Sequence, residues 1–103
     1  MSEFDTAMDL LAQRFLVRCD NDLAKLKDCL QNSTGKEGEA RHIVHRMSGS
    51  AGIFGHTTIG ALAAQVDGEL AAGSPVGTTT LPTLIDALSS LLAAQHDKQA
   101  GSS

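Results

Sequence analysis

Apolar residues recur at intervals of three and four along most of this chain, and the stretch Glu39–Gly55 shows the pattern most clearly. On a helix that turns about 100° per residue, residues with this spacing lie on one face. The apolar residues that gather on that face are Ala40, Ile43, Val44, Met47, Ala51 and Phe54. Gly55 is expected to end the helix as its C-terminal cap. The stretch therefore predicts an amphipathic helix with one buried face.

The first third of the chain has the same spacing, with one interruption. Before the interruption stand Phe4, Met8, Leu11 and Phe15, and after it stand Leu23, Leu26 and Leu30. Cys19–Asp22 interrupts the pattern with residues that favour helix caps. We expect a helix of about fifteen residues, a kink or break, and a second helix from about Asp20 to Asn32. A loop rich in Gly, Ser and Thr then leads into the central helix, which is expected to start at Lys36 or Gly38.

Two more helices are expected after the central one. The first starts at Thr57 or Thr58 and ends near Gly73, and the second has Pro82 in its first turn and ends near Gln95. Their apolar faces consist of Ile59, Leu62, Ala63, Val66 and Leu70, and of Leu81, Leu84, Ile85, Leu88, Leu91 and Leu92. Residues 96–103 lack this spacing and are expected to form a frayed tail. The pattern predicts an all-α fold, an up-and-down antiparallel four-helix bundle with an extra short or kinked N-terminal helix.

The length of 103 residues suits one domain, so we assign residues 1–103 to a single unit with a core of about residues 5–95. The formal net charge is −4 and Lys and Arg form no stripe, which argues against nucleic-acid binding. The acidic start of the chain is unlike a signal peptide, and no apolar run is long enough to span a membrane. We therefore expect a monomeric cytoplasmic protein without membrane contact. Cys19 and Cys29 are expected to be reduced thiols that pack in the core.

The polar face of the central helix is unusual. On a helix, Arg41, His42, Ser48, Gly49 and Gly52 all lie within roughly 60° of His45. Glycine inside a helix costs about 0.5–1 kcal/mol relative to alanine, so a helix selected only for stability would avoid it. The two glycines leave the imidazole of His45 exposed and let another surface approach closely. The alternative is that they permit close packing between helices of this chain, or that the helix ends early.

The segment His45–Gly55, HRMSGSAGIFG, resembles the signature of histidine-containing phosphotransfer (HPt) domains. That signature is a histidine, an apolar residue two later, a glycine four later, small residues, and a glycine that ends the helix. The resemblance implies a phosphoryl carrier that accepts the group on His45 from a receiver aspartate linked to a kinase and passes it to a response-regulator aspartate. It implies no enzyme activity, metal or cofactor in the chain itself, with magnesium supplied by the partner. The implied partners are receiver domains of response regulators and of hybrid sensor histidine kinases.

The resemblance also implies supporting residues around His45. HPt domains commonly hold one ring nitrogen with a Gln or Glu 22 positions after the histidine, and that position is Asp67 here. Gln65 is a weaker candidate, because it falls on the other flank of its helix. Many HPt domains carry lysine three residues after the histidine, where this chain has Ser48. Arg41, one turn before His45, is expected to supply the positive charge instead, and Arg46 is less well placed.

Residues next to His45 are expected to form the surface that binds the partner. We assign Arg41, His42, Gly49, Gly52 and Ile53 to it, together with a residue of the first helix such as Leu11 or Phe15. Two other classes of function remain open at this point. One is a helical adaptor that binds a partner through the Gly49/Gly52 face without phosphorylation. The other is a metal-dependent enzyme using His42 and His45, which lacks an evident third ligand.

Overall fold

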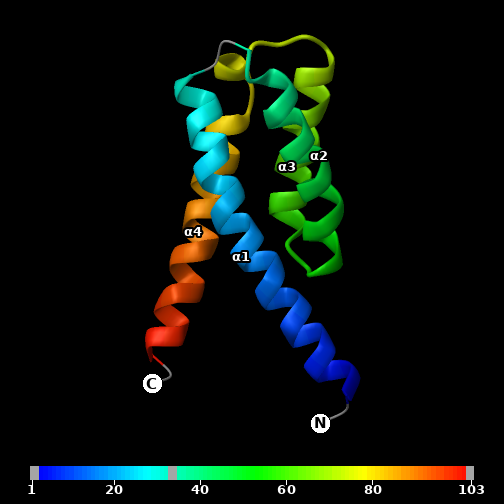
Figure 1. The fold of residues 1–103 in the computed structure, drawn as a ribbon, viewed down its shortest axis with the longest axis vertical. Helices are drawn as coiled ribbons and strands as arrows, with labels where there is room; N and C mark the ends of the chain where they lie inside the picture. Colours follow the sequence, from blue (N-terminus) through cyan, green and yellow to red (C-terminus); the bar gives the residue numbers. More distant parts are fainter. Residues whose placement is uncertain (1–2, 33–34, 102–103) are drawn as a thin grey trace.

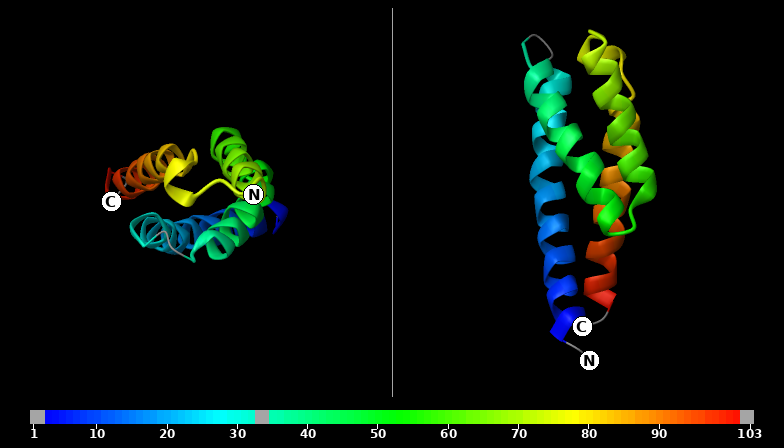
Figure 2. Two further views of the ribbon diagram at one scale, coloured as in Figure 1. Left: turned by 90° about the horizontal axis from the view of Figure 1, so that it is seen from above. Right: turned by 90° about the vertical axis from the view of Figure 1, so that its right-hand side faces the viewer.

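The computed structural model describes residues 3–32 and 35–101, which form four α-helices and one short 3-10 helix. The elements are α1 (Glu3–Gln31), α2 (Glu37–Ile53), α3 (Thr57–Ala71), η1 (Val76–Thr78) and α4 (Leu81–Gly101). The helices alternate in direction, and both ends of the chain lie at the same end of the bundle (Figure 1). Figure 2 shows α2 and α3 as a shorter hairpin beside the long helices α1 and α4. The predicted all-α, antiparallel four-helix bundle is confirmed.

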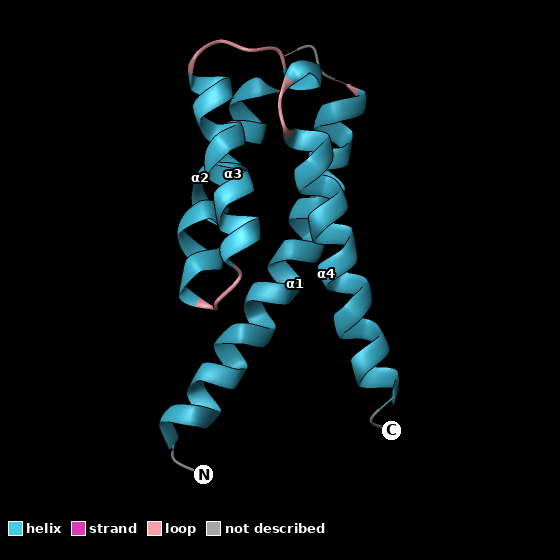
Figure 3. Cartoon of the chain, turned by 180° about the vertical axis from the view of Figure 1, so that it is seen from behind, coloured by secondary structure: helices cyan, strands magenta, loops and turns pink. Residues whose placement is uncertain are grey.

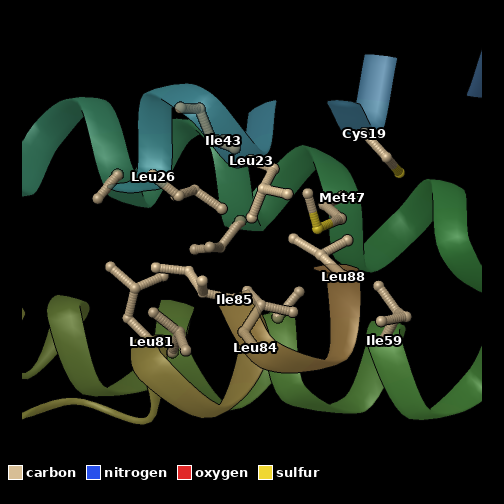
Figure 4. Close-up of a cluster of buried hydrophobic side chains, with 14 of the residues drawn as sticks. Cys19, Leu23, Leu26, Ile43, Met47, Ile59, Leu81, Leu84, Ile85 and Leu88 are labelled. Carbon is tan, nitrogen blue, oxygen red and sulfur yellow. The ribbon is translucent and has the colours of Figure 1, made fainter. Parts of the chain in front are cut away.

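The apolar face of each helix turns toward one shared core. Leu26 of α1, Met47 of α2, Val66 of α3 and Leu84 of α4 are each at most 1% exposed. Figure 4 shows side chains from all four helices interleaved in this core. Burying an aliphatic side chain of this size contributes about 1.5–3 kcal/mol, so the core fixes the rotation of each helix about its axis. That rotation leaves the opposite, polar face of α2 in solvent.

The predicted break in the first helix is wrong, because α1 runs without interruption from Glu3 to Gln31. Cys19 and Asp22, two of the residues taken as helix-capping signals, are buried at 1% and 3% exposure. The Asp22 carboxylate accepts hydrogen bonds from Arg46 of α2 instead of capping a helix. A buried partner therefore replaces the local contact that would have ended the helix. Cys19 and Cys29 are free and buried, as predicted.

Glycines end α2 and α3 as the sequence indicates. Gly55 follows α2 with a φ of 80°, and Gly73 follows α3 with a φ of 92°. Beyond Gly55, the His56 N–H donates to the Ala51 carbonyl at 2.9 Å, which satisfies a carbonyl at the helix end. α3 begins at Thr57, one of the two predicted starts.

The predicted end of the last helix near Gln95 is wrong, because α4 continues to Gly101. The sequence between these residues contains no proline and no glycine, so the backbone can remain helical without an apolar face. The fraying of this segment stays a prediction. The predicted loop residues 33–34 and the chain ends at 1–2 and 102–103 lie outside the described residues.

The helices α2 and α3 lie close together at a glycine that the sequence analysis did not single out. A Cβ atom on Gly60 would lie 3.4 Å from the Ser48 carbonyl oxygen and 3.6 Å from the Ala51 Cβ. These are ordinary van der Waals distances, so the two helices lie in close contact here and a Cβ atom would still fit. Figure 3 shows the resulting hairpin, joined by a short loop at its lower end. Within residues 3–32 and 35–101, no helix combines the length and the apolar character that a membrane span requires.

Candidate functional site

The imidazole of His45 stands on the solvent-facing side of α2, with its side chain 76% exposed. The opposite side of the helix is buried through Ala40, Ile43, Val44, Met47 and Ala51. These buried residues hold α2 in one orientation. His45 is therefore presented by a rigid element, yet its ring is open to a macromolecular partner.

One carboxylate of α3 links two side chains of α2. The His45 Nδ1 atom lies 3.0 Å from Asp67 Oδ2, and Arg41 Nε donates to Asp67 Oδ1 at 3.2 Å. The Asp67 side chain is 20% exposed, and that of Arg41 is 56% exposed. The structure thus brings together three residues that the sequence analysis selected. Gln65, the weaker candidate, is exposed on α3, and Asp67 is the residue that contacts the ring.

The surroundings of Asp67 decide which nitrogen of His45 carries a proton. The hydrogen bond with His45 lowers the pKa of Asp67 below its ordinary value of 3.8, partial desolvation opposes this, and Arg41 adds to the lowering. The carboxylate is therefore ionised at neutral pH, and an ionised carboxylate only accepts hydrogen bonds. Nδ1 must then be the donor. In a neutral ring this leaves the lone pair of Nε2 free, pointing away from the contact with Asp67.

Ser48, three residues after His45, hydrogen-bonds to its own helix. Its hydroxyl donates to the backbone carbonyl of His45 at 2.8 Å, so the hydroxyl is occupied by its own helix. Arg41 is the cation that shares a carboxylate with His45. His42 is exposed and lines a shallow hollow together with Gly38, Arg41 and His45. In the part of the chain that the structure describes, no three His, Cys, Asp or Glu side chains are grouped so as to hold a metal ion.

Gly49 and Gly52 are exposed, and a Cβ atom on either would have no neighbour within 4 Å. The helix continues past both of them to Ile53. Neither glycine therefore serves close packing inside this chain, and neither ends the helix. Both alternatives considered for them are wrong. The two glycines instead leave a strip of bare backbone beside His45.

Arg46 faces away from this site, toward α1. Its Nη2 atom donates to both carboxylate oxygens of Asp22 at 2.7 Å, and Asp22 is 5% exposed at its side chain. Sequence analysis missed this ion pair, because residues 24 positions apart on two helices carry no local signal of their contact.

The candidates for a docking residue on α1 differ in exposure. Phe15 is buried at 6% exposure, and its ring packs against Phe54 at 5.2 Å between centroids and stacks on His56 at 5.4 Å. Phe15 is therefore mainly a core residue, and little of its side chain is left for a partner. Leu11, at 46% exposure, and Ile53, at 70%, are open to a partner.

A helical bundle that exposes a histidine on a helix face with two bare glycines, with an acidic side chain against the ring, is an arrangement suited to carrying a group between proteins. The sequence matches the family model described as the Hpt domain over residues 10–94. The chain belongs to the Hpt domain family. Searches of curated proteins and of solved structures returned no match.

Membership of the family establishes the general activity of the chain. Hpt domains take part in histidine phosphotransfer within phosphorelays and interact there with receiver domains. They are phosphocarriers and not catalytic enzymes.

Proposed function

We propose that His45 carries the phosphoryl group, accepting it from the aspartate of a kinase-linked receiver domain and passing it to the aspartate of a response regulator. The observation that carries this proposal is the position of the ring. His45 is 76% exposed, while its Nδ1 atom is held 3.0 Å from the Asp67 carboxylate. An exposed ring with one nitrogen held and the other free suits a nucleophile that must enter another protein's site.

The transfer needs few groups from this chain. The Nε2 lone pair attacks the phosphorus of the aspartyl phosphate, an N–P bond forms, and the P–O bond to the aspartate breaks. The aspartate leaves as a carboxylate and keeps the electron pair. The ring then bears phosphoryl on Nε2 and a proton on Nδ1, so it is cationic, and the Asp67 carboxylate offsets that charge. Passing the group to a second aspartate is the same step in reverse.

Arg41 is proposed to offset the negative charge of the phosphoryl group. Only its Nε atom is engaged by Asp67 in the structure, and its side chain is 56% exposed. A guanidinium has five N–H donors, so the amino groups of Arg41 remain for oxygens of the transferred group. Phosphoryl transfer relies mainly on positioning and charge stabilisation. Magnesium on the receiver domain is proposed to supply the rest of that stabilisation.

The proposed partners are receiver domains of response regulators and of hybrid sensor histidine kinases. We propose that Arg41, His42, Gly49, Gly52 and Ile53 form the surface that meets them. The bare backbone at the two glycines supports this, because it allows a partner helix to lie close to His45. We further propose that the chain acts as a monomer in the cytoplasm.

The test uses phosphoramidate as a small donor, which needs no docking surface. The wild-type protein and the variants His45→Gln and His42→Gln are treated with it, and their intact masses are measured. We expect one added phosphoryl group, labile in acid and stable in alkali, in wild type and His42→Gln, and none in His45→Gln. Labelling of His45→Gln to the wild-type level would show that another residue carries the group.

A helical adaptor that binds a receiver through the Gly49/Gly52 face is the alternative function. The same observation, two exposed glycines without internal packing, favours it. Signalling measured in cells separates the two, because an adaptor keeps its output in His45→Gln and a carrier loses it.

A further inference from the structure

The side of α1 that faces α2 is basic, although the whole chain has a formal net charge of −4. A hollow between the two helices is lined by Arg14, Arg18, Lys25 and Arg46, together with Asn21 and Asp22. Among these cations, Arg46 is paired with the buried carboxylate of Asp22. Arg14, Arg18 and Lys25 are exposed, and none of the ion pairs found within residues 3–32 and 35–101 uses them. We call these three residues the basic strip, and they correct the expectation from the sequence that Lys and Arg form no stripe.

An apolar hollow adjoins the basic strip. It lies between α1 and the end of α2 and is lined by Leu11, Phe15, Ser50 and Phe54, with Arg14 and Arg18 at its edge. Leu11 is 46% exposed at this place. Arg14 and Arg18 thus border an apolar surface on one side and a polar hollow on the other. Such a mixture of an apolar centre and a charged rim is typical of surfaces that bind another protein.

The basic strip and His45 belong to one continuous surface. Counting about 100° per residue from His45, Gly49 lies at about 40°, Ile53 at about 80° and Arg46 at about 100° in one direction. Arg46 contacts α1, so this direction leads to the basic strip. Arg41 lies at about 40° in the other direction and contacts α3. Between His45 and α1 the surface includes exposed His42, bare backbone at Gly49, and Ile53, which is 70% exposed.

We infer that the basic strip recognises an acidic patch on the receiver domain, beside the apolar contact made by Leu11 and Ile53, and that it sets which receivers exchange phosphoryl groups with this chain. The inference rests on the proposed function and names a specificity determinant for it. A receiver that binds magnesium with carboxylates presents negative charge near its aspartate. Unpaired cations at the rim of a docking surface raise the association rate of an acidic partner and disfavour a basic one.

The test separates labelling from docking. First, wild type, Arg14→Glu/Arg18→Glu and Lys27→Glu are labelled with phosphoramidate, and their thermal unfolding is compared. Second, each labelled protein is mixed with the receiver domain from the same genome that accepts the phosphoryl group fastest from wild type. Lys27→Glu reverses one charge where the double variant reverses two, and it serves as the control because Lys27 is exposed on the same helix about 140° from Arg14.

We expect all three proteins to be labelled equally and to unfold alike, since the exchanged side chains are exposed. Transfer from Arg14→Glu/Arg18→Glu to the receiver should be slower by about tenfold or more at low salt. The wild-type rate should fall as salt is added, and the difference between the two proteins should shrink. Lys27→Glu should transfer within about twofold of wild type.

Two results would overturn the inference while the proposed function stands. One is a labelled Arg14→Glu/Arg18→Glu protein that transfers at the wild-type rate. The other is an equal loss of transfer in Lys27→Glu, which would assign the effect to net charge and not to the basic strip. If phosphoramidate does not label His45 in wild type, the proposed function itself fails, and the inference falls with it.

Discussion

Asp67 shows at the residue scale what the sequence can and cannot predict. Its position, 22 residues after His45, pointed to it, and the structure places its carboxylate 3.0 Å from the ring. Aspartate is shorter than the Gln or Glu expected at this position. It reaches the ring because α3 lies close to α2 at this point. The second contact of Asp67, with Arg41, could not be predicted, because it depends on that spacing between the helices.

The lowered pKa of Asp67 predicts a pH-dependent contribution to stability. A carboxyl group whose folded pKa lies below its unfolded value of 3.8 stabilises the fold above that value, and the contribution is lost as the pH falls through the folded pKa. Asp67→Asn should therefore be less stable than wild type by about 0.5–1 kcal/mol near pH 6. The difference should shrink as the pH falls below 3.8 and the carboxylate takes up its proton. Urea unfolding of both proteins over a series of pH values measures this, and a difference that stays constant down to the lowest pH would contradict it.

The variants Arg41→Ala and Arg46→Ala are expected to have different effects. The first should mainly slow phosphoryl transfer, and the second should mainly lower stability. Arg41→Ala should slow transfer to a receiver by about tenfold, the value of one charged hydrogen bond, and should change stability by less than about 1 kcal/mol. Arg46→Ala should leave the transfer rate within about twofold of wild type and lower stability by about 2–3 kcal/mol, because it strands the buried Asp22. Transfer kinetics and urea unfolding on the same preparations check both. Equal transfer rates in the two variants would show that Arg41 has no role in phosphoryl transfer.

At the scale of the elements, α2 has two flanks with different tasks. The flank toward α3 carries the His45–Asp67–Arg41 contacts, and the flank toward α1 carries the ion pair of Arg46 with Asp22. The apolar spacing predicted the buried face of α2, because it is a local property of the sequence. It could not predict that Asp22 pairs across helices, and for that reason the break in α1 was wrongly expected. An acidic residue inside a helix signals a cap only when no buried partner is available.

The ion pair between α1 and α2 predicts a large effect of Asp22. Removing one partner of a buried pair leaves the other charge without compensation, so Asp22→Ala should lower the free energy of unfolding by about 3 kcal/mol. Asp20→Ala, an exposed position on the same helix, should change it by less than about 0.5 kcal/mol. Denaturant unfolding of both variants provides the measurement. Similar small effects in the two would show that the pair does not hold the helices together.

Gly49 is expected to lower the stability of α2 and to leave His45 accessible to a partner. Gly49→Gln should raise stability by about 0.5 kcal/mol, because Gln favours helix and a Cβ atom at this position meets nothing within 4 Å. The same side chain should block a receiver and abolish transfer, while phosphoramidate labelling of His45 continues. Gly68→Gln is the matched control, since Gly68 lies inside α3 and is equally open. It should gain similar stability and transfer normally, and normal transfer by Gly49→Gln would contradict the docking surface.

At the scale of the whole molecule, the sequence predicted the order of the main helices because each has a regular apolar face, but it placed a break in α1 that the structure does not have. It did not predict the extent of α4, which continues to Gly101 in a segment without that face. The sequence also did not predict which polar side chains on different helices contact one another. The site and the basic strip both lie where α2 meets a neighbouring helix, so each becomes visible only in the assembled bundle.

The central claim is that His45 carries the phosphoryl group on Nε2 while Asp67 holds Nδ1. Long-range proton–nitrogen correlation spectra of the protein, labelled with nitrogen-15 and recorded before and after phosphoramidate treatment, test it most directly. Of the 4 histidines in the chain, we expect only His45 to change, from a ring protonated at Nδ1 to one that keeps this proton and bears phosphorus on Nε2. Asp67→Asn should lose the preference for the Nδ1 proton. Phosphorus on Nδ1 of His45, or on any other histidine, would contradict the account.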